Sequence, residues 1–292
     1  MRTRDNGCQS SASTARSTRI PRAFRRAVLS LLIAALCHDS GALAQQARTP
    51  SLEDLAKAAQ NPIADTISVG LENIAMPNTG PYRQTADVFK IEPVIPFELN
   101  ADWNLVTRTT IPGIAQVRFS PEQGRIGGVG DINQIFALTP SHSGALIWGV
   151  GPTFSYPSAT DPALGSGKWS AGPTLVALTM PGPWVLGVLA NNIWSFAGPS
   201  DRAPVNQMML QYFVTYNFSD GSYVSSSPII TANWLAKGND RWVVPIGVGV
   251  GKLFMVDRQP INAEVGVYYN LLKPDQASHW QLRASLAFLF PK

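Results

Sequence analysis

Apolar and polar residues alternate along most of the chain from position 65 onward, and the alternation is clearest at positions 280–290. Trp280 and Leu282 fall on one parity of this stretch, while Gln281 and Arg283 fall on the other. Successive side chains of a β-strand point to opposite faces, so the pattern predicts a strand with one face suited to hydrocarbon and one suited to polar surroundings. We expect this last strand to pair with the first one and to close a barrel.

Segments of roughly ten residues with this alternation recur along the chain, separated by turn residues. They cover residues 65–74, 88–99, 103–116, 131–138, 145–156, 168–180, 184–196, 205–218, 223–234, 241–255, 261–272 and 280–290. The connections after the first, third and fifth segments are longer than those after the even-numbered segments, as in bacterial barrels with short periplasmic turns and longer external loops. The sequence therefore predicts an all-β fold, a transmembrane antiparallel β-barrel of about 12 strands with both ends on the periplasmic side.

Charged residues fall on the inner parity of these segments. The six lumen-lining candidates are Lys90, Glu92, Arg108, Lys168, Glu264 and Arg283. A dry core would penalise such charges heavily, whereas a wide barrel leaves room for water. We therefore expect a membrane barrel with a polar lumen rather than a soluble β-sandwich. Glu92 and Arg108 lie on neighbouring strands, as do Glu264 and Arg283. We interpret each of these two pairs as a structural ion pair rather than as part of a substrate site.

Residues 1–44 have the features of a cleaved secretory signal peptide. Four arginines between positions 19 and 26 precede an apolar run at positions 27–37, and Ala42-Leu43-Ala44 supplies the pattern of small residues at a cleavage site. The apolar run is too short to span a bilayer as a helix. We expect the remaining chain to reach the bacterial cell outer membrane.

Removing the signal peptide changes the composition. Residues 45–292 hold 16 basic and 17 acidic side chains, so the basic pI of 9.2 does not indicate nucleic acid binding. Cys8 and Cys37 both lie in the removed part, which excludes disulfides and thiolate metal sites from the rest of the chain. No apolar stretch after residue 44 approaches the roughly 18 residues of a helical membrane span.

Residues 45–63 form a separate segment ahead of the barrel, which takes residues 64–292. Ser51 is a candidate helix cap, Asp54 follows three positions later, and Leu52 and Leu55 begin an apolar spacing typical of a helix. We predict one short helix that ends before Pro62. The sequence leaves three roles open for this segment: a periplasmic extension, a plug in the barrel mouth, or a loose tether.

Two local patterns suggest chemistry at first sight. The glycines at positions 247, 249 and 251 precede Lys252, but Leu253 stands where a phosphate-binding loop needs Ser or Thr. We interpret these glycines as slim inner-face positions where the strand must bend or another group approaches closely. His142 and His279 are predicted in a periplasmic turn and an outer loop, too far apart to share a metal. We expect no catalytic, cofactor-binding or metal-ligating residues, and no enzyme.

Several short motifs resemble those of a known family. They include Gln60-Asn61-Pro62, Glu92-Pro93-Val94-Ile95-Pro96-Phe97, Asp102-Trp103-Asn104-Leu105, Gly130-Asp131-Ile132-Asn133, Trp148-Gly149-Val150-Gly151-Pro152, Gly165-Ser166-Gly167-Lys168-Trp169, Pro181-Gly182-Pro183-Trp184, Ser227-Pro228-Ile229-Ile230-Thr231-Ala232-Asn233-Trp234 and Phe290-Pro291-Lys292. With them the chain resembles, from about Gln60 to Lys292, the MetA-pathway-of-phenol-degradation-like outer-membrane β-barrel family, whose members are also labelled transporter or misnamed neuromedin U. The resemblance implies passage of small molecules, aromatic or otherwise apolar ones among them, and it supplies no catalytic or binding residues.

Three functions remain as hypotheses at this stage. The first is a porin-like outer-membrane channel or transporter for small solutes. The alternative is a plugged structural or adhesive barrel without transport, and the third is a membrane-embedded hydrolase, for which His279 is the candidate. The expected partners are the lipid bilayer, a small-molecule solute and the barrel-assembly machinery, with no nucleic acid and no cofactor.

Overall fold

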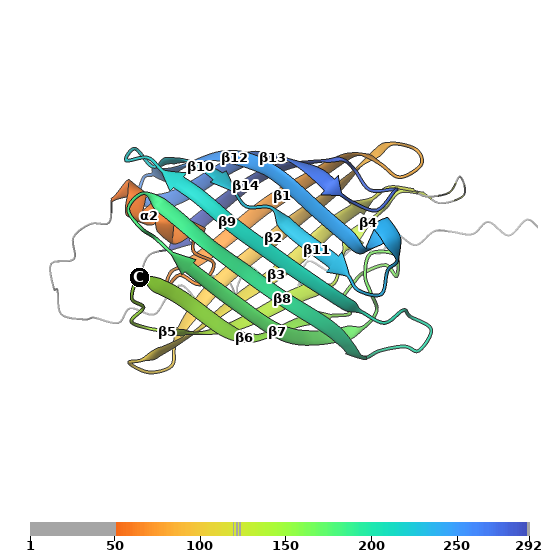
Figure 1. Ribbon diagram of the computed structural model, residues 1–292, viewed down its shortest axis with the longest axis horizontal. Coiled ribbons are helices and arrows are strands. Elements are labelled where there is room, and N and C mark those ends of the chain that lie inside the picture. The colour runs from red at the N-terminus through yellow and green to blue at the C-terminus, as the bar shows by residue number, and fades with distance from the viewer. Residues whose placement is uncertain (1–50, 119, 121, 123, 291–292) are drawn as a thin grey trace, which may run out of the picture. The chain divides into compact units, whose positions relative to one another are not determined.

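The computed structural model describes residues 51–118, 120, 122 and 124–290 (Figure 1). The predicted signal peptide, residues 1–44, and positions 45–50 lie outside the described residues. The helices are α2 (Leu52–Gln60) and the 3-10 helix η1 (Gly238–Arg241). The strands are β1 (Ile67–Thr79), β2 (Gln84–Glu98), β3 (Trp103–Gln116), β4 (Ile126–Val129), β5 (Ile132–Pro140), β6 (Leu146–Tyr156), β7 (Trp169–Thr179), β8 (Trp184–Ala197), β9 (Asn206–Asn217), β10 (Ser222–Ser226), β11 (Ile229–Asn233), β12 (Trp242–Val256), β13 (Gln259–Leu272) and β14 (Trp280–Phe290). Neither helix of this part of the chain is long and apolar enough to cross a bilayer.

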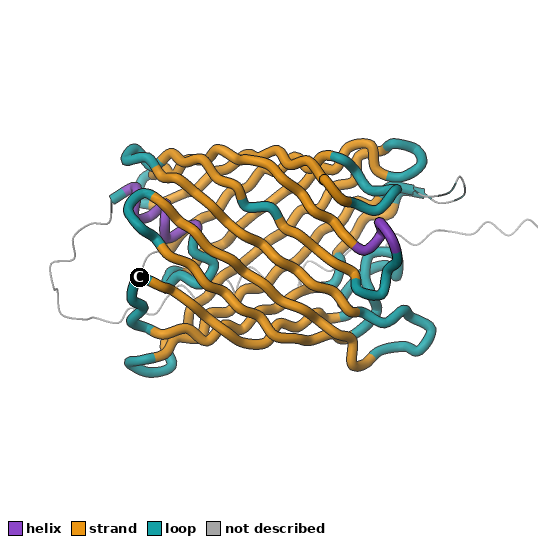
Figure 2. The backbone as a smooth tube through the Cα atoms, viewed as in Figure 1, coloured by secondary structure: helices purple, strands orange, loops and turns teal. Residues whose placement is uncertain are grey.

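The strands form one antiparallel sheet that closes on itself (Figure 1, Figure 2). The last strand pairs with the first, from Ile67 opposite Phe290 to Ala75 opposite Leu282, which confirms the predicted closure. β4 and β5 lie end to end along β3, and β10 and β11 lie end to end between β9 and β12. β4 and β5 together act as one strand of the wall, and so do β10 and β11. The barrel therefore has 12 strands, as predicted.

Exposure alternates along the strands as the sequence pattern indicates. On β14, Leu282 and Leu286 are 49% and 41% exposed, whereas Arg283 between them is 9% exposed. On β12, Val248 is exposed and Leu253 is fully buried. In a closed barrel the exposed parity is the outer surface, so the apolar parity faces outward and the polar parity faces the interior.

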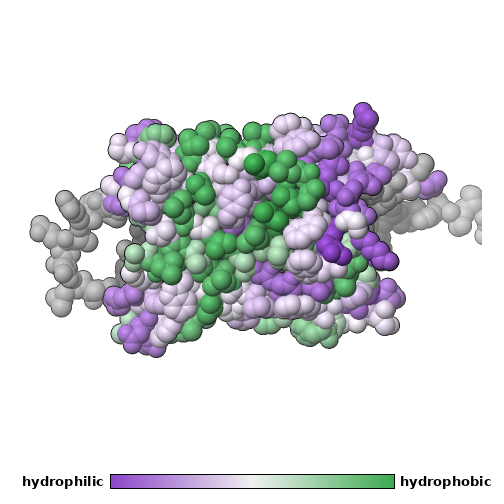
Figure 3. Space-filling model, in the orientation of Figure 1, coloured by the Kyte–Doolittle hydropathy of each residue, from purple (hydrophilic) through white to green (hydrophobic). Residues whose placement is uncertain are grey.

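An apolar belt surrounds the barrel. Figure 3 shows hydrophobic residues gathered across the middle of one face, with hydrophilic residues concentrated at the ends. Aromatic residues contact each other at both edges of the belt. The pairs are Trp103–Trp148 and Trp184–Tyr216 at one edge, and Trp234–Trp242 and Tyr269–Trp280 at the other. An apolar band between two aromatic girdles is typical of transmembrane barrels, so this barrel spans a membrane.

The two ends of the barrel differ in the length of their connections. We name one the turn end, which carries residues 99–102, 141–145, 180–183, 218–221 and 257–258. The other is the loop end, which carries residues 80–83, 117–118, 120, 122, 124–125, 157–168, 198–205, 234–241 and 273–279. The predicted alternation is present. The first loop, however, was expected to be long and is a short turn, because β1 and β2 continue to pair up to Thr79 and Gln84. In bacterial barrels the short turns face the periplasm.

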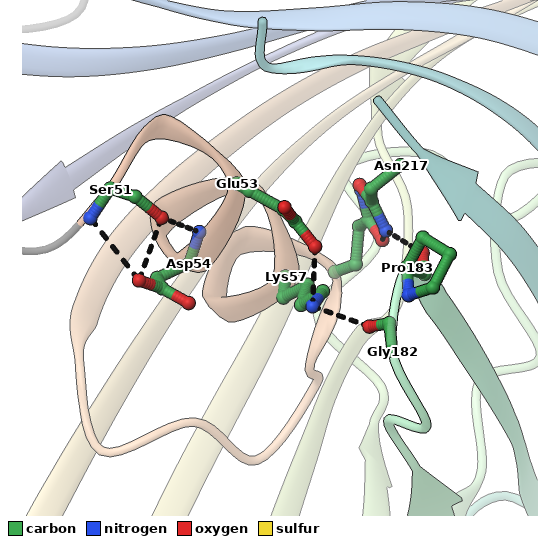
Figure 4. Close-up of polar contacts among 8 residues, drawn as sticks. Ser51, Glu53, Asp54, Lys57, Gly182, Pro183 and Asn217 are labelled. Carbon is green, nitrogen blue, oxygen red and sulfur yellow. Dashed lines mark hydrogen bonds and ion pairs between the residues drawn. The ribbon is translucent and has the colours of Figure 1, made fainter. Parts of the chain in front are cut away.

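The predicted helix is present at the turn end. The hydroxyl of Ser51 accepts a hydrogen bond from the backbone N–H of Asp54 at 3.1 Å, and the carboxylate of Asp54 accepts one from the N–H of Ser51 at 3.2 Å (Figure 4). This capping box satisfies N–H groups that the first turn would otherwise leave unpaired. Ala56 is fully buried against Leu253 of β12 and Leu289 of β14, so the wall of the barrel holds the helix in place.

Apolar side chains fill part of the interior toward the turn end. The buried cluster consists of Ile63, Val106, Ala137, Val176, Leu178, Val185, Leu189 and Phe213. Apart from Ile63, which follows α2 in the chain, these residues come from β3, β5, β7, β8 and β9. Those strands form one side of the wall. The sequence pattern alone indicates a uniformly polar interior. The observed interior instead has an apolar side and a charged side.

Candidate functional site

The barrel encloses a cavity of about 710 Å³, which we take as the candidate functional site. Gln60 and Pro62 line it near the turn end, and Asp240 and Arg241 line it near the loop end. Inner-face side chains from most of the wall strands line it between these points. The cavity therefore extends along much of the barrel axis.

Two ion pairs on β1, β2 and β3 form a charged wall of the cavity. Nζ of Lys90 lies 2.6 Å from Oε2 of Glu72, and Nη2 of Arg108 lies 3.0 Å from Oε2 of Glu92. Oγ1 of Thr110 also donates to Oε1 of Glu92 at 2.9 Å. All four charged side chains keep some exposure and line the cavity, so these charges can meet a solute.

Of the two ion pairs, the sequence analysis predicted only the one between Glu92 and Arg108. The pair between Glu92 and Arg108 is the one expected from their positions on neighbouring strands. Glu72 was not among the candidates, although its parity is opposite to that of the outward-facing Leu71. A search for inward carboxylates directly across the ladder from Lys90 would have found it.

Glu264 on β13 is held by hydroxyl groups. Its Oε2 accepts a hydrogen bond from the phenol of Tyr223 at 3.0 Å, and its Oε1 accepts one from Ser225 at 2.9 Å. The amide of Asn262 donates to the same phenol at 2.9 Å. These four side chains line the cavity beside the charged wall, and they extend its polar surface onto β10 and β13.

Arg283 on β14 does not form the expected ion pair with Glu264. Its guanidinium lies over the ring of Tyr268, 4.2 Å from the ring centre, and donates to the side-chain oxygen of Gln281 at 2.8 Å. It also donates to the backbone oxygen of Ser227 at 3.1 Å. Adjacent strands made the pairing plausible, but the long side chain extends past Glu264 toward β10 and β11.

Lys168 lies outside the lumen. It precedes β7 in the loop of residues 157–168, and its Nζ donates to the backbone oxygen of Pro199 in the next loop. Its neighbour Ser166 donates to the carboxylate of Asp131 through both its N–H, at 2.6 Å, and its hydroxyl, at 2.8 Å. Lys168 therefore helps to tie the loops together at the loop end, because the strand begins one residue later than its period-two pattern indicates.

The glycines of β12 leave space for the polar side chains of its neighbours. A Cβ atom at Gly249 would lie 2.6 Å from Oε1 of Glu264, and one at Gly251 would lie 2.2 Å from the ring of Tyr223. Both distances are shorter than real contacts. The sequence interpretation of these glycines as positions of close approach is confirmed, and they are what allows Tyr223 to reach Glu264.

An apolar surface on the opposite side of the wall completes the cavity. It is formed by Ile193 of β8 and by Met209 and Phe213 of β9. Val94 and Ile135 lie beside Arg108 in the ladder and, with Met209, pack against the buried apolar cluster. A molecule in the cavity therefore meets charged groups on one side and hydrocarbon on the other.

The helix at the turn end is tied to neighbouring turns by polar contacts (Figure 4). Nζ of Lys57 lies 2.7 Å from the carboxylate of Glu53 and donates to the backbone oxygen of Gly182 at 2.5 Å. The side-chain amides of Gln60 and Asn217 exchange hydrogen bonds at 2.7 and 3.2 Å. The helix and the residues after it thus cover part of the opening at this end.

The two histidines of the described chain lie at opposite ends of the barrel. His142 is in a connection at the turn end, and His279 at the loop end stacks on Tyr269 with a ring separation of 5.7 Å. Across the described residues, no group of three or more His, Cys, Asp or Glu side chains is arranged to hold a metal ion. The hydrolase hypothesis gains no support from the stacking contact of His279.

No protein-family model matches the chain, and no curated protein matches it. Solved structures do match. An outer membrane channel from Pseudomonas putida F1 shares 14% identity and a TM-score of 0.58, and the match covers 86% of this chain and 99% of that channel. The NanC porin shares 9% identity and a TM-score of 0.50 over 77% of this chain and all of the porin.

These similarities agree with the closed wall and the apolar belt. The chain is an outer-membrane β-barrel by fold. At this sequence identity the similarities show the fold, and the solute is argued from the cavity.

Proposed function

We propose that this protein is an outer-membrane channel for small solutes that combine a polar or charged group with an aromatic or other apolar part. The observation that carries the proposal is the two-sided cavity. Glu92 and Arg108 offer charge on one side, and Phe213 and Ile193 offer hydrocarbon on the other. A volume of about 710 Å³ is in the range of cavities that hold small molecules.

The charges favour no single sign of solute. The inner-face carboxylates Glu72, Glu92 and Glu264 are balanced by Lys90, Arg108 and Arg283. The two similar solved structures, an outer membrane channel and a porin, also support a channel. Discrimination would then come from shape and from the match between polar and apolar surfaces, rather than from net charge.

Liposome swelling with the reconstituted protein tests the proposal. Benzoate and benzylamine, which combine an aromatic ring with a charge, are expected to enter faster than a sugar of similar size. Conductance across a planar bilayer should show ion flow through the same cavity. A folded barrel that neither conducts ions nor admits any of these solutes would refute the channel.

A plugged barrel without transport is the second candidate function, favoured by the contacts of α2. Ala56 is fully buried against the wall, and Asn61 and Pro62 line the cavity from the turn end. Deleting residues 46–60 separates the two functions. A channel that already conducts should change little, whereas a plugged barrel should gain conductance sharply.

A further inference from the structure

The wall has a long interruption in its ladder of hydrogen-bonded pairs. Between β10–β11 and β12, pairing stops after Ser225 opposite Gly249 and resumes at Thr231 opposite Val243. Positions 226–230 and 244–248 face each other in between, and we name this stretch the ladder gap. Figure 2 shows part of it as a short loop segment in the middle of the wall, where β10 ends and β11 begins.

The ladder gap differs from the other interruptions of the described wall. Elsewhere the pairing skips at most a few positions, for example between Ile91 opposite Ile111 and Val94 opposite Arg108. The register is the same on both sides of the ladder gap, so no inserted residue explains it. The gap holds two prolines, Pro228 and Pro245, and the shorter skips also hold prolines, Pro93 on β2 and Pro173 on β7 among them. Proline therefore accounts for lost rungs in several places, but the ladder gap is longer than these skips.

Side chains replace ladder bonds at the gap. The hydroxyl of Ser226 donates to the backbone oxygen of Gly247 at 2.7 Å, and Arg283 reaches from β14 to the backbone oxygen of Ser227 at 3.1 Å. Tyr268, beneath the Arg283 guanidinium, holds that group in position. Backbone groups at membrane depth need partners, and here part of that need is met by side chains that can change rotamer.

The cavity and the lipid approach each other closely at this place. Ser225, Ser227 and Ile229 line the cavity on one side of the ladder gap. On the outer face Ile246 and Val248 are 51% and 56% exposed. The gap lies between the aromatic contacts Trp234–Trp242 and Tyr216–Phe218, so it opens toward the hydrocarbon of the membrane rather than toward water.

We propose that the ladder gap is a lateral outlet through which an uncharged apolar molecule leaves the cavity between β11 and β12 and enters the bilayer. Parting two strands of a complete ladder exposes several backbone groups to hydrocarbon at once. At the ladder gap, the bonds to exchange are those that Ser226 and Arg283 donate and the one from the backbone N–H of Ser227 to the phenol of Tyr268 at 3.4 Å. A charged molecule would lose its hydration on this path, so the outlet selects against it. This inference rests on the proposed channel function and adds to it a second exit for uncharged apolar molecules, while charged solutes follow the axis of the barrel.

A reversible cross-link tests the outlet. Residues 45–292 contain no cysteine, so the double variant S226C/V248C places two thiols opposite each other across the ladder gap. Opposed positions of an antiparallel pair lie within disulfide range. V224C/V250C is the matched control, because it joins the same two strands at a rung where the ladder is intact.

The probe is N-phenyl-1-naphthylamine, an uncharged aromatic dye that fluoresces in lipid, added to bacteria that carry the full chain in the outer membrane. Oxidation of S226C/V248C is expected to abolish most dye uptake, and a reductant should restore it. The oxidised control should keep wild-type uptake. Bilayer conductance of both variants should stay unchanged, because ions follow the axis of the barrel.

Two results would overturn the outlet: dye uptake that survives the S226C/V248C cross-link, or a cross-link that lowers uptake and conductance together. The variant Pro228→Val tests the outlet without a cross-link, since it returns a backbone N–H to the gap and should reduce uptake. Pro173→Val on β7 is its control. A wild-type protein that neither conducts nor admits the dye would instead refute the channel function itself.

Discussion

Nη2 of Arg108 and Oε2 of Glu92 lie 3.0 Å apart on neighbouring strands, and both side chains line the cavity. Each group compensates the charge of the other in a lumen that is only partly open to solvent. Replacing Arg108 with Ala should lower the free energy of unfolding by about 1–3 kcal/mol, because Glu92 loses a charge-assisted hydrogen bond. It should also shift the channel toward cations. Denaturant unfolding and the reversal potential across a salt gradient measure the two effects.

Lys252 and Asp220 provide the control for this prediction. Their ion pair is 3.0 Å long but lies at the turn end with both side chains more than half exposed. Lys252→Ala should cost less than about 1 kcal/mol, because solvent screens exposed pairs. Equal losses for Arg108→Ala and Lys252→Ala would show that the lumen pair is no better protected than a surface pair.

Asp220 predicts a pH dependence at the turn end. Its carboxylate accepts hydrogen bonds from the side chain and the backbone N–H of Ser222, at 2.5 and 3.1 Å, and it also contacts Lys252. The side-chain hydrogen bond from Ser222 first, and then Lys252, hold the pKa of this carboxyl well below its usual range. Because the pKa is depressed by folding, this carboxylate supports the turn above about pH 4 and the contribution is lost as the pH falls toward the folded pKa.

An NMR titration of the Asp220 carboxyl in detergent measures that pKa directly. Its midpoint should lie below the ordinary value of about 3.9. Ser222→Ala should raise the midpoint more than Lys252→Ala, since the hydroxyl is the larger cause. An ordinary midpoint in the unmodified protein would contradict the hydrogen bonds of this turn.

Phe213 links the buried cluster to the cavity. It is 7% exposed, and its ring occupies the space above Gly187, where a Cβ atom would lie 2.3 Å away. Phe213→Ala should destabilise the barrel by about 3–5 kcal/mol and raise single-channel conductance, because the lost ring widens the cavity. Val214→Ala, the next residue and 40% exposed on the outer face, should change neither quantity appreciably. Similar conductance for both variants would argue that ions do not pass Phe213.

Ala56 tests the seating of α2. The residue is completely buried between Leu253 and Leu289, so Ala56→Leu overfills the contact and should displace the helix. Conductance should rise slightly, because the displaced helix no longer covers part of the opening at the turn end. Ala58→Leu, at a less buried position of the same helix, should leave it in place. Unchanged conductance in Ala56→Leu would mean that α2 does not restrict the pore.

The strands were predictable because their signal is local. A residue that alternates with its neighbours in polarity lies on a fixed face, so segments such as Trp103–Gln116 and Trp280–Phe290 appear in the structure with the bounds expected. The capping box of Ser51 and Asp54 is equally local. The same alternation of polar and apolar positions correctly predicted that Arg283 faces the interior.

The hydrogen-bond partners of the inner-face side chains depend on how far each side chain extends across neighbouring strands. The alternation of polar and apolar positions does not predict this. Arg283 extends to Ser227 instead of pairing with Glu264, and Glu264 takes Tyr223 because glycines on β12 leave it room. The apolar cluster around Phe213 was missed for the same reason, since it needs side chains from five strands to converge. The ladder gap leaves Pro228 and Pro245 as its traces in the sequence, and prolines such as Pro93 and Pro173 also stand at the shorter skips, so these residues do not single out the gap.

Label accessibility in lipid vesicles tests most directly whether the apolar parity faces lipid and the charged parity lines a wet interior. Single cysteines would replace Leu282 and Val267 on the outer face and Thr110 and Ser285 on the inner face, each carrying a nitroxide. The first two labels should collide with oxygen dissolved in the bilayer, and the last two with a water-soluble nickel chelate. The reverse pattern, or four labels inaccessible to both reagents, would contradict the membrane barrel.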